Sequence, residues 1–163
     1  MVDDDYSRCK TILVAGHFSG DGALRKLRYI ERLHDALEQL GYSLLIVNMS
    51  TSKANTNHPY ISCPIDIAVP YRLSGSDFLN RDDLTPDLLR ASVVEAEMYQ
   101  QPFPESAFRI VLYTSWIREI IQKNGVCLCL IWHEFNGPHH ALTALCESMT
   151  IPYLYMEYGL LPG

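Results

Sequence analysis

Continuous apolar runs alternate with amphipathic stretches along most of the chain, and this alternation predicts the order of its elements. Residues 10–17 (KTILVAGH), 42–50 (YSLLIVNMS) and 126–133 (VCLCLIWH) are typical of strands buried on both faces of a parallel sheet. Residues 65–71 (IDIAVPY) predict a short third strand, and residues 151–159 (IPYLYMEYG) predict the last one. We therefore expect a mainly parallel sheet.

The stretches between these runs have the periodicity of helices. Leucines and an isoleucine at spacings of three and four predict an amphipathic helix over residues 23–40, ended by Gly41. Further helices are predicted over 82–101, which begins with a Thr-Pro-Asp capping sequence, over 105–125 and over 137–149. The polar segment 51–64 and the segment before the second helix are predicted to be loops.

Strands and helices in this order predict an α/β fold, a Rossmann-like doubly wound domain that spans residues 1–163. The sequence stops directly after the last predicted strand, without a helix to cover the sheet there. We therefore expect a domain truncated at its C-terminus, the N-terminal part of a longer protein. Its uncovered apolar face predicts self-association.

Composition narrows the classes of protein to consider. The chain carries 19 acidic and 13 basic residues, a net charge of −6, which argues against nucleic-acid binding. Neither a secretory signal nor an apolar run of membrane-spanning length is found, so a cytoplasmic location with reduced thiols is expected. Cys127 and Cys129 are expected on one face of a strand, as buried thiols rather than metal ligands.

Three loops rich in glycine and polar residues follow predicted strands, within residues 16–26, 133–140 and 156–163. Ligands of open α/β sheets bind at the carboxyl ends of the parallel strands. The sequence therefore predicts one crevice that all three loops line.

The first of these loops, GHFSGDG, contains His17, Gly20, Asp21 and Gly22. Its glycine spacing fits neither a dinucleotide fingerprint nor a phosphate-binding P-loop. Because it precedes a helix N-terminus, its backbone N–H groups could bind a carboxylate or phosphate. An equally good interpretation is a turn in which Asp21 or Ser19 caps the helix.

The second loop, HEFNGPHH, resembles a zinc-protease motif only superficially. His133 and His139 are six residues apart, with Gly137 between them, whereas that motif needs two histidines one helical turn apart. No metal is expected here, although a zinc site completed from elsewhere stays open. Asn136 or Gly137 as a helix cap explains the corner structurally, and the histidines suit proton transfer or anion binding.

The third loop places Glu157 at the end of an otherwise apolar strand. A carboxylate is costly in a core and useful in a crevice, which favours a functional role. The alternative is that Glu157 pairs with a helix N-terminus or with His133.

Together these loops resemble the bacterial capsule polysaccharide biosynthesis family of Kdo-type glycosyltransferases. The motif residues that carry the resemblance are Trp132, Asn136, Gly137, Glu157, Gly159, Leu161, Pro162 and Gly163. The resemblance implies that the chain is the N-terminal, acceptor-side half of a two-domain GT-B enzyme, inactive alone. It implies a nucleotide-sugar donor, a glycan or glycolipid acceptor and no cofactor, and leaves peripheral association with the inner membrane open.

The resemblance also implies roles for the predicted site residues. Glu157 would act as base or stabilise positive charge at the anomeric carbon, assisted by His133 and His139. His17, Gly20, Asp21 and Gly22 would bind the substrate, with the backbone N–H groups at the two glycines close to an anionic sugar. Asn136 with Gly137 would position a hydroxyl group. The competing hypothesis is a non-catalytic α/β module that binds a partner or a small anion.

Overall fold

Strands and helices alternate through the described parts of the chain. The computed structural model describes residues 10–18, 23–51, 56, 60–65, 72, 79, 84–132 and 136–156. The elements are β1 (Thr11–Gly16), α1 (Ala23–Gln39), β2 (Ser43–Asn48), β3 (Tyr60–Ser62), α2 (Pro86–Tyr99), α3 (Phe103–Asn124), β4 (Val126–Trp132), α4 (Gly137–Ser148) and β5 (Tyr153–Met156).

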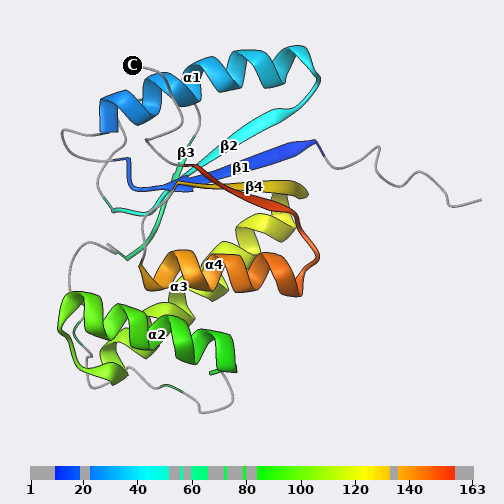
Figure 1. The fold of residues 1–163 in the computed structure, drawn as a ribbon. Helices are drawn as coiled ribbons and strands as arrows, with labels where there is room; N and C mark the ends of the chain where they lie inside the picture. Colours follow the sequence, from blue (N-terminus) through cyan, green and yellow to red (C-terminus); the bar gives the residue numbers. More distant parts are fainter. Residues whose placement is uncertain are drawn as a thin grey trace, which may run out of the picture.

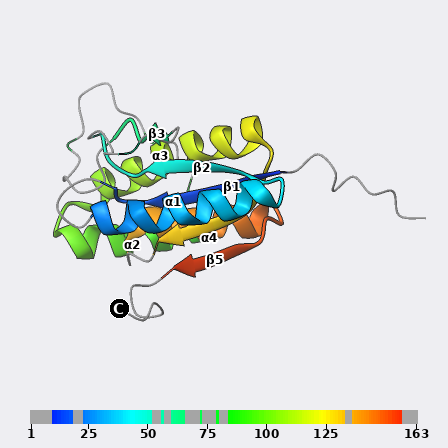
Figure 2. The same cartoon turned by 90° about the horizontal axis from the view of Figure 1, so that it is seen from above.

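The five strands form one parallel sheet in the order β3-β2-β1-β4-β5 (Figure 2). Helix α1 covers one face, and α2, α3 and α4 lie on the other (Figure 1). The predicted Rossmann-like α/β class is therefore confirmed. The chain moves outward from β1 to β2 and β3, then returns to the other side of β1 for β4 and β5. The strand order thus reverses between β1 and β4, and this reversal is where such sheets bind ligands.

Alternation along the buried strands builds a separate core on each face of the sheet. In β1, Ile12 and Val14 pack towards α1, whereas Leu13 and Ala15 pack towards α2–α4. Because β1 is covered on both sides, its sequence is a continuous apolar run rather than an alternating one.

The helix ends follow the capping chemistry of the sequence closely. The Thr85 side chain caps α2 by accepting a hydrogen bond from the Leu88 N–H at 3.3 Å. Gly125 ends α3 in the left-handed conformation, with φ of 56°. The predicted start of α3 was wrong by two residues, because Pro104 lies in its first turn, where a missing N–H breaks no helical hydrogen bond.

The loop predicted over residues 51–64 contains a strand that the sequence did not predict. Strand β3 comprises Tyr60–Ser62, inside the predicted loop, and pairs with Ile46–Asn48. Residue 65, where the predicted strand began, lies in a bend, and residues 66–71 lie outside the described residues. A three-residue edge strand of half-buried side chains has no apolar run that could reveal it.

The expectation that Cys127 and Cys129 share a face was also wrong. The pairing of β1 with β4 shifts register between Thr11 and Ile12, opposite Val126 and Leu128. One extra residue of β4 is therefore accommodated as a bulge, which interrupts the alternation of side chains. Cys127 consequently packs on the α1 side, and Cys129 lies in the core on the α2–α4 side.

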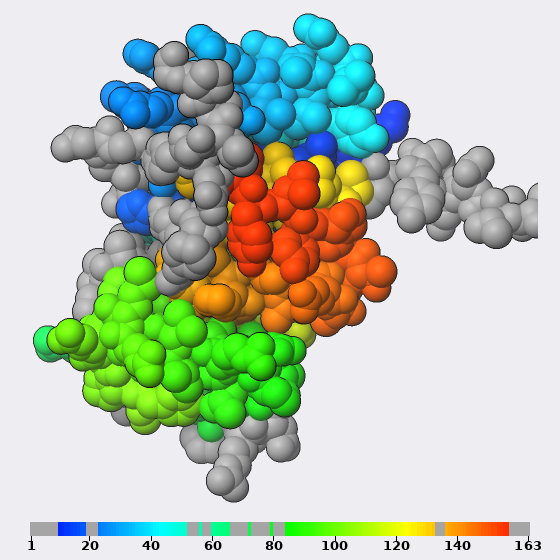
Figure 3. Space-filling view, viewed as in Figure 1, coloured from blue at the N-terminus to red at the C-terminus, as the bar shows by residue number. Residues whose placement is uncertain are grey.

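Strand β5 forms one edge of the sheet and is only partly covered. Leu154 and Tyr155 are 59% and 46% exposed. In the space-filling view β5 (red) lies at the surface between α1 and α4 (Figure 3). Within the described residues, no helix combines the length and the apolar character needed to cross a membrane.

Gly16, the last residue of β1, is packed too closely to accept a side chain. A Cβ atom there would lie 2.9 Å from Trp132 Cβ and 2.9 Å from Phe18 Cζ. We expect Gly16→Ala to lower the free energy of unfolding by about 1–3 kcal/mol through overpacking, measured by urea denaturation. The control is Gly41→Asn, at a φ of 80° that asparagine tolerates and with open space around the Cβ, for which less than about 1 kcal/mol is expected. Equal losses in the two variants would contradict the steric account.

Candidate functional site

The candidate site lies where the carboxyl ends of β1, β4 and β5 come together. These strands are neighbours in the sheet, so the three loops predicted to line a crevice leave adjacent strand ends. At this edge β1 ends in Gly16, β4 in Trp132 and β5 in Met156.

The structure describes four of the nine predicted site residues. His17, Asn136, Gly137 and His139 are described, whereas Gly20, Asp21, Gly22, His133 and Glu157 lie outside the described residues. His17 directly follows β1, and the other three belong to the N-terminal turn of α4.

A lysine that the sequence analysis did not single out lies at the reversal of strand order. Lys26 is in the first turn of α1 and is only 7% exposed. Its Nζ donates a hydrogen bond to the carbonyl of His17 at 3.2 Å, and lies 5.9 Å from the centre of the Trp132 ring. An ammonium group is thereby held between the ends of β1 and β4, where it can attract a carboxylate or phosphate.

The turn after β1 is hydrogen-bonded to Asn48, the last residue of β2. The fully buried Asn48 accepts a hydrogen bond from the Phe18 N–H on its Oδ1, at 3.0 Å. The Met49 N–H in turn donates to the carbonyl of Gly16 at 2.9 Å. These bonds stabilise the backbone around His17, whose carbonyl accepts the hydrogen bond from Lys26.

Asn136 and His139 form a closed pair at the start of α4. Asn136 is the N-cap of this helix, and its Oδ1 accepts from the His139 N–H at 3.1 Å. The same oxygen lies 2.5 Å from His139 Nδ1, which must therefore be the protonated nitrogen. In the neutral ring the lone pair is then on Nε2, the atom that could accept a proton. His139 is 3% exposed, so in this structure it also packs as part of the protein interior.

The N-terminus of α4 is occupied by a carboxylate of the protein itself. Glu95 of α2 accepts a hydrogen bond from the Gly137 N–H on its Oε2, at 3.1 Å. Its other oxygen forms an ion pair with Arg109 of α3, and both side chains are 0% exposed. Arg109 also stacks over the ring of Tyr99, with Cζ 5.0 Å from its centre. A helix N-terminus attracts anions, and this one already has an internal anion.

Position 137 has no room for a side chain, because α2 packs directly against it. A Cβ atom there would lie 2.6 Å from the Ala91 carbonyl oxygen and 2.7 Å from Glu95 Cβ. The residue lets α2 and α4 approach closely enough for the hydrogen bond between Glu95 and the backbone.

The charged and polar groups near the end of β1 therefore differ between the two faces of the sheet. On the side of α4, the helix N-terminus is satisfied by Asn136 and Glu95; on the side of α1, Lys26 supplies a cation.

A groove of about 150 Å³ lies elsewhere, among α2, α3 and α4. Those helices lie on the opposite sheet face from α1, so this groove is separate from the Lys26 side. Among the described residues, no group of three or more His, Cys, Asp or Glu side chains could hold a metal ion.

The helical periodicity of the sequence does indicate that Lys26 and Glu95 are buried, although neither was predicted to be. Lys26 follows the buried Ala23 by three residues and precedes the buried Ile30 by four, so it lies on the inner face of its helix. Glu95 follows Leu88 by seven residues in the same way. A charged residue at a position where helical periodicity requires an apolar one indicates a buried, partnered charge.

Comparisons with known proteins give no relative for this chain: no protein-family model matches it, and no curated protein does.

The buried ion pair can be tested by removing one charge or both. Arg109→Met leaves the Glu95 carboxylate without its cation in the core, and should lower the free energy of unfolding by about 3–5 kcal/mol. The double change Glu95→Gln/Arg109→Met removes both charges and should cost less than the single one. Urea denaturation measures both.

The matched control for this pair is Arg118→Met, which removes an exposed arginine from the same helix. It should change stability by less than about 0.5 kcal/mol. If the double variant were no more stable than Arg109→Met, electrostatic compensation between Glu95 and Arg109 would be refuted.

Proposed function

We propose that this chain is a glycosyltransferase-type domain of capsular or cell-surface polysaccharide biosynthesis, in which an anionic sugar substrate binds at the strand ends beside Lys26. The observation that carries the anionic part of the proposal is the buried Lys26 ammonium at the reversal of strand order. The sugar-transfer part rests on the resemblance of the loops after β4 and β5 to Kdo-type glycosyltransferases.

In the proposed reaction, a hydroxyl oxygen of the acceptor attacks the anomeric carbon of a nucleotide-activated sugar. The bond from that carbon to the phosphate oxygen breaks, and a base takes the proton of the hydroxyl group. Glu157 is the proposed base or the carboxylate that stabilises positive charge on the sugar ring, because it directly follows β5 at this edge. His133, which directly follows β4, would assist the proton transfer.

Lys26 would bind the carboxylate of a sugar acid or a phosphate of the donor. A charge-assisted hydrogen bond in a site shielded from water is stronger than one in solution. Its contact with the His17 carbonyl holds the ammonium in place, and so reduces the entropy that binding would otherwise cost. Asn136 and His139, already bonded to each other, would hold the first turn of α4 beside the reacting groups.

A non-catalytic module that binds a small anion is the second candidate. The observation that favours it is the internal capping of α4: Glu95 takes the place at the helix N-terminus where a donor phosphate could bind. Such a module would bind inorganic phosphate as well as any nucleotide or sugar acid.

Calorimetric titration of the purified chain with CMP, UDP, GDP, the sugar acid Kdo and inorganic phosphate tests the proposal. We expect a nucleotide or Kdo to bind more tightly than phosphate. Lys26→Met should weaken this binding about ten- to a hundredfold, the effect of losing one charged hydrogen bond. Methionine has a similar volume, so the packing of α1 should persist.

Arg25→Met is the matched control, because it removes the same charge from the neighbouring, exposed position. It should leave the binding constant nearly unchanged. Equal binding of phosphate and nucleotide would favour the anion-binding module. Absence of binding by a folded sample, or equal effects of the two substitutions, would contradict the role of Lys26.

A further inference from the structure

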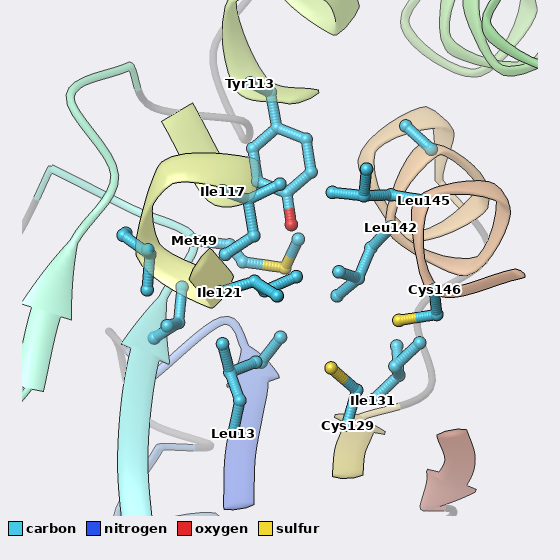
Figure 4. Packing of buried hydrophobic residues seen from close by; sticks show 14 of the residues in the cluster. Leu13, Met49, Tyr113, Ile117, Ile121, Cys129, Ile131, Leu142, Leu145 and Cys146 are labelled. Atoms are coloured by element: carbon cyan, nitrogen blue, oxygen red, sulfur yellow. The ribbon is translucent and has the colours of Figure 1, made fainter. Parts of the chain in front are cut away.

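Two buried cysteines face each other across the core between the sheet and α4, away from the candidate site. Cys129 belongs to β4 and Cys146 to α4, and both are free thiols with 0% exposure. In the close view of this core, both sulfur atoms lie in the space between β4 and α4 (Figure 4). Both residues belong to the core cluster between the sheet and helices α2–α4.

The side chains of the two thiols interact, and this interaction makes them chemically unequal. Interaction with the Cys129 side chain lowers the pKa of the Cys146 thiol, although burial acts in the opposite direction. Interaction with the Cys146 side chain, together with burial, raises the pKa of the Cys129 thiol. Cys146 is therefore the sulfur that becomes a thiolate first, and the thiolate is the reactive form of cysteine.

We propose that Cys129 and Cys146 are a redox modification site, which a small peroxide converts to an intramolecular disulfide. The Cys146 thiolate attacks one oxygen of hydrogen peroxide, which gives a sulfenic acid and, after protonation, one molecule of water. The Cys129 sulfur then attacks the Cys146 sulfur, and the hydroxide that leaves takes up the Cys129 proton as a second water. Two thiols and one peroxide give one disulfide and two waters.

The other described cysteines are excluded by their positions. Cys127 lies on the opposite face of β4 because of the bulge, with its thiol bonded to the Thr11 carbonyl. Cys63 follows β3, three inter-strand steps from β4, which is roughly 14 Å at the usual strand spacing. A disulfide requires Cα atoms within about 7 Å of each other.

The disulfide would close a loop that contains the whole connection from β4 to α4. Asn136 and His139 lie inside this loop, so oxidation would fasten the helix that carries them to the strand that ends at Trp132. Because both sulfurs are fully buried, the oxidant must reach them during local opening of α4. The reaction is therefore expected to be slower than oxidation of the half-buried Cys127.

The experiment is disulfide mapping of the folded full chain after treatment with hydrogen peroxide. Remaining thiols are alkylated in denaturant, and the protein is cut after glutamate without reduction. Cleavage after Glu134 and Glu147 separates the peptide of Cys129 from that of Cys146. We expect a linked pair of peptides, two hydrogens lighter than their sum, that separates on reduction.

A variant that retains only this pair, Cys9→Ser/Cys63→Ala/Cys127→Ser, removes ambiguity between Cys127 and Cys129 and should give the same link. The additional change Cys146→Ser should abolish it. The wild-type mapping stands without these variants if they fold poorly. Full alkylation of Cys129 and Cys146 in a sample whose Cys127 is oxidised would overturn the proposal, as would a predominant link between any other two cysteines.

Discussion

The buried carboxylate of Glu95 is the point on which the packing of three helices depends. It joins α2, which carries it, to α3 through Arg109 and to α4 through the Gly137 N–H. A buried charge is tolerated only where its partners are in place. In any other packing of these helices, the Glu95 carboxylate would be buried without its partners, at a large cost in desolvation free energy. The first turn of α4, with Asn136 and His139, is positioned by this requirement.

The sheet separates this ion pair from the other buried charge. Lys26 reaches the strand ends from α1, on the opposite face, where its ammonium contacts the His17 carbonyl and lies near the Trp132 ring. The protein has thus satisfied one potential anion site, the N-terminus of α4, with its own carboxylate, while it holds an ammonium at the same edge of the sheet. This asymmetry is the reason why the proposed anion-binding site is placed on the side of α1.

The sequence predicted most of the fold because strands buried on both faces are apolar throughout and because the helix caps follow simple chemistry. Thr85 and Gly125 are examples, since each satisfies the backbone groups of a helix end by its own side chain or conformation. Strand β3 was missed because its side chains are half-buried, and the bulge near Cys127 because the pairing partner that creates it is distant in sequence.

The candidate site was predicted less completely than the fold. Asn136 as a cap followed from local sequence, and the structure confirms it. Glu95, Arg109 and Lys26 were missed because a charged residue in a helix is normally assumed to face solvent, and only its partners on other elements reveal otherwise. Those partners become neighbours through tertiary packing, which the sequence alone does not display.

The strand order also has a consequence for how the chain folds. Strands β1 and β2 are joined by one helix and can pair early, but β1 pairs with β4 across most of the chain: the Cys127 thiol and the Thr11 carbonyl that meet there are 116 positions apart. Contacts of such separation close a long loop and form slowly. The pairing of β1 with β4 is therefore expected to form late, so a nascent chain would display the unpaired edge of β1 until residues 126–132 have been synthesised and docked.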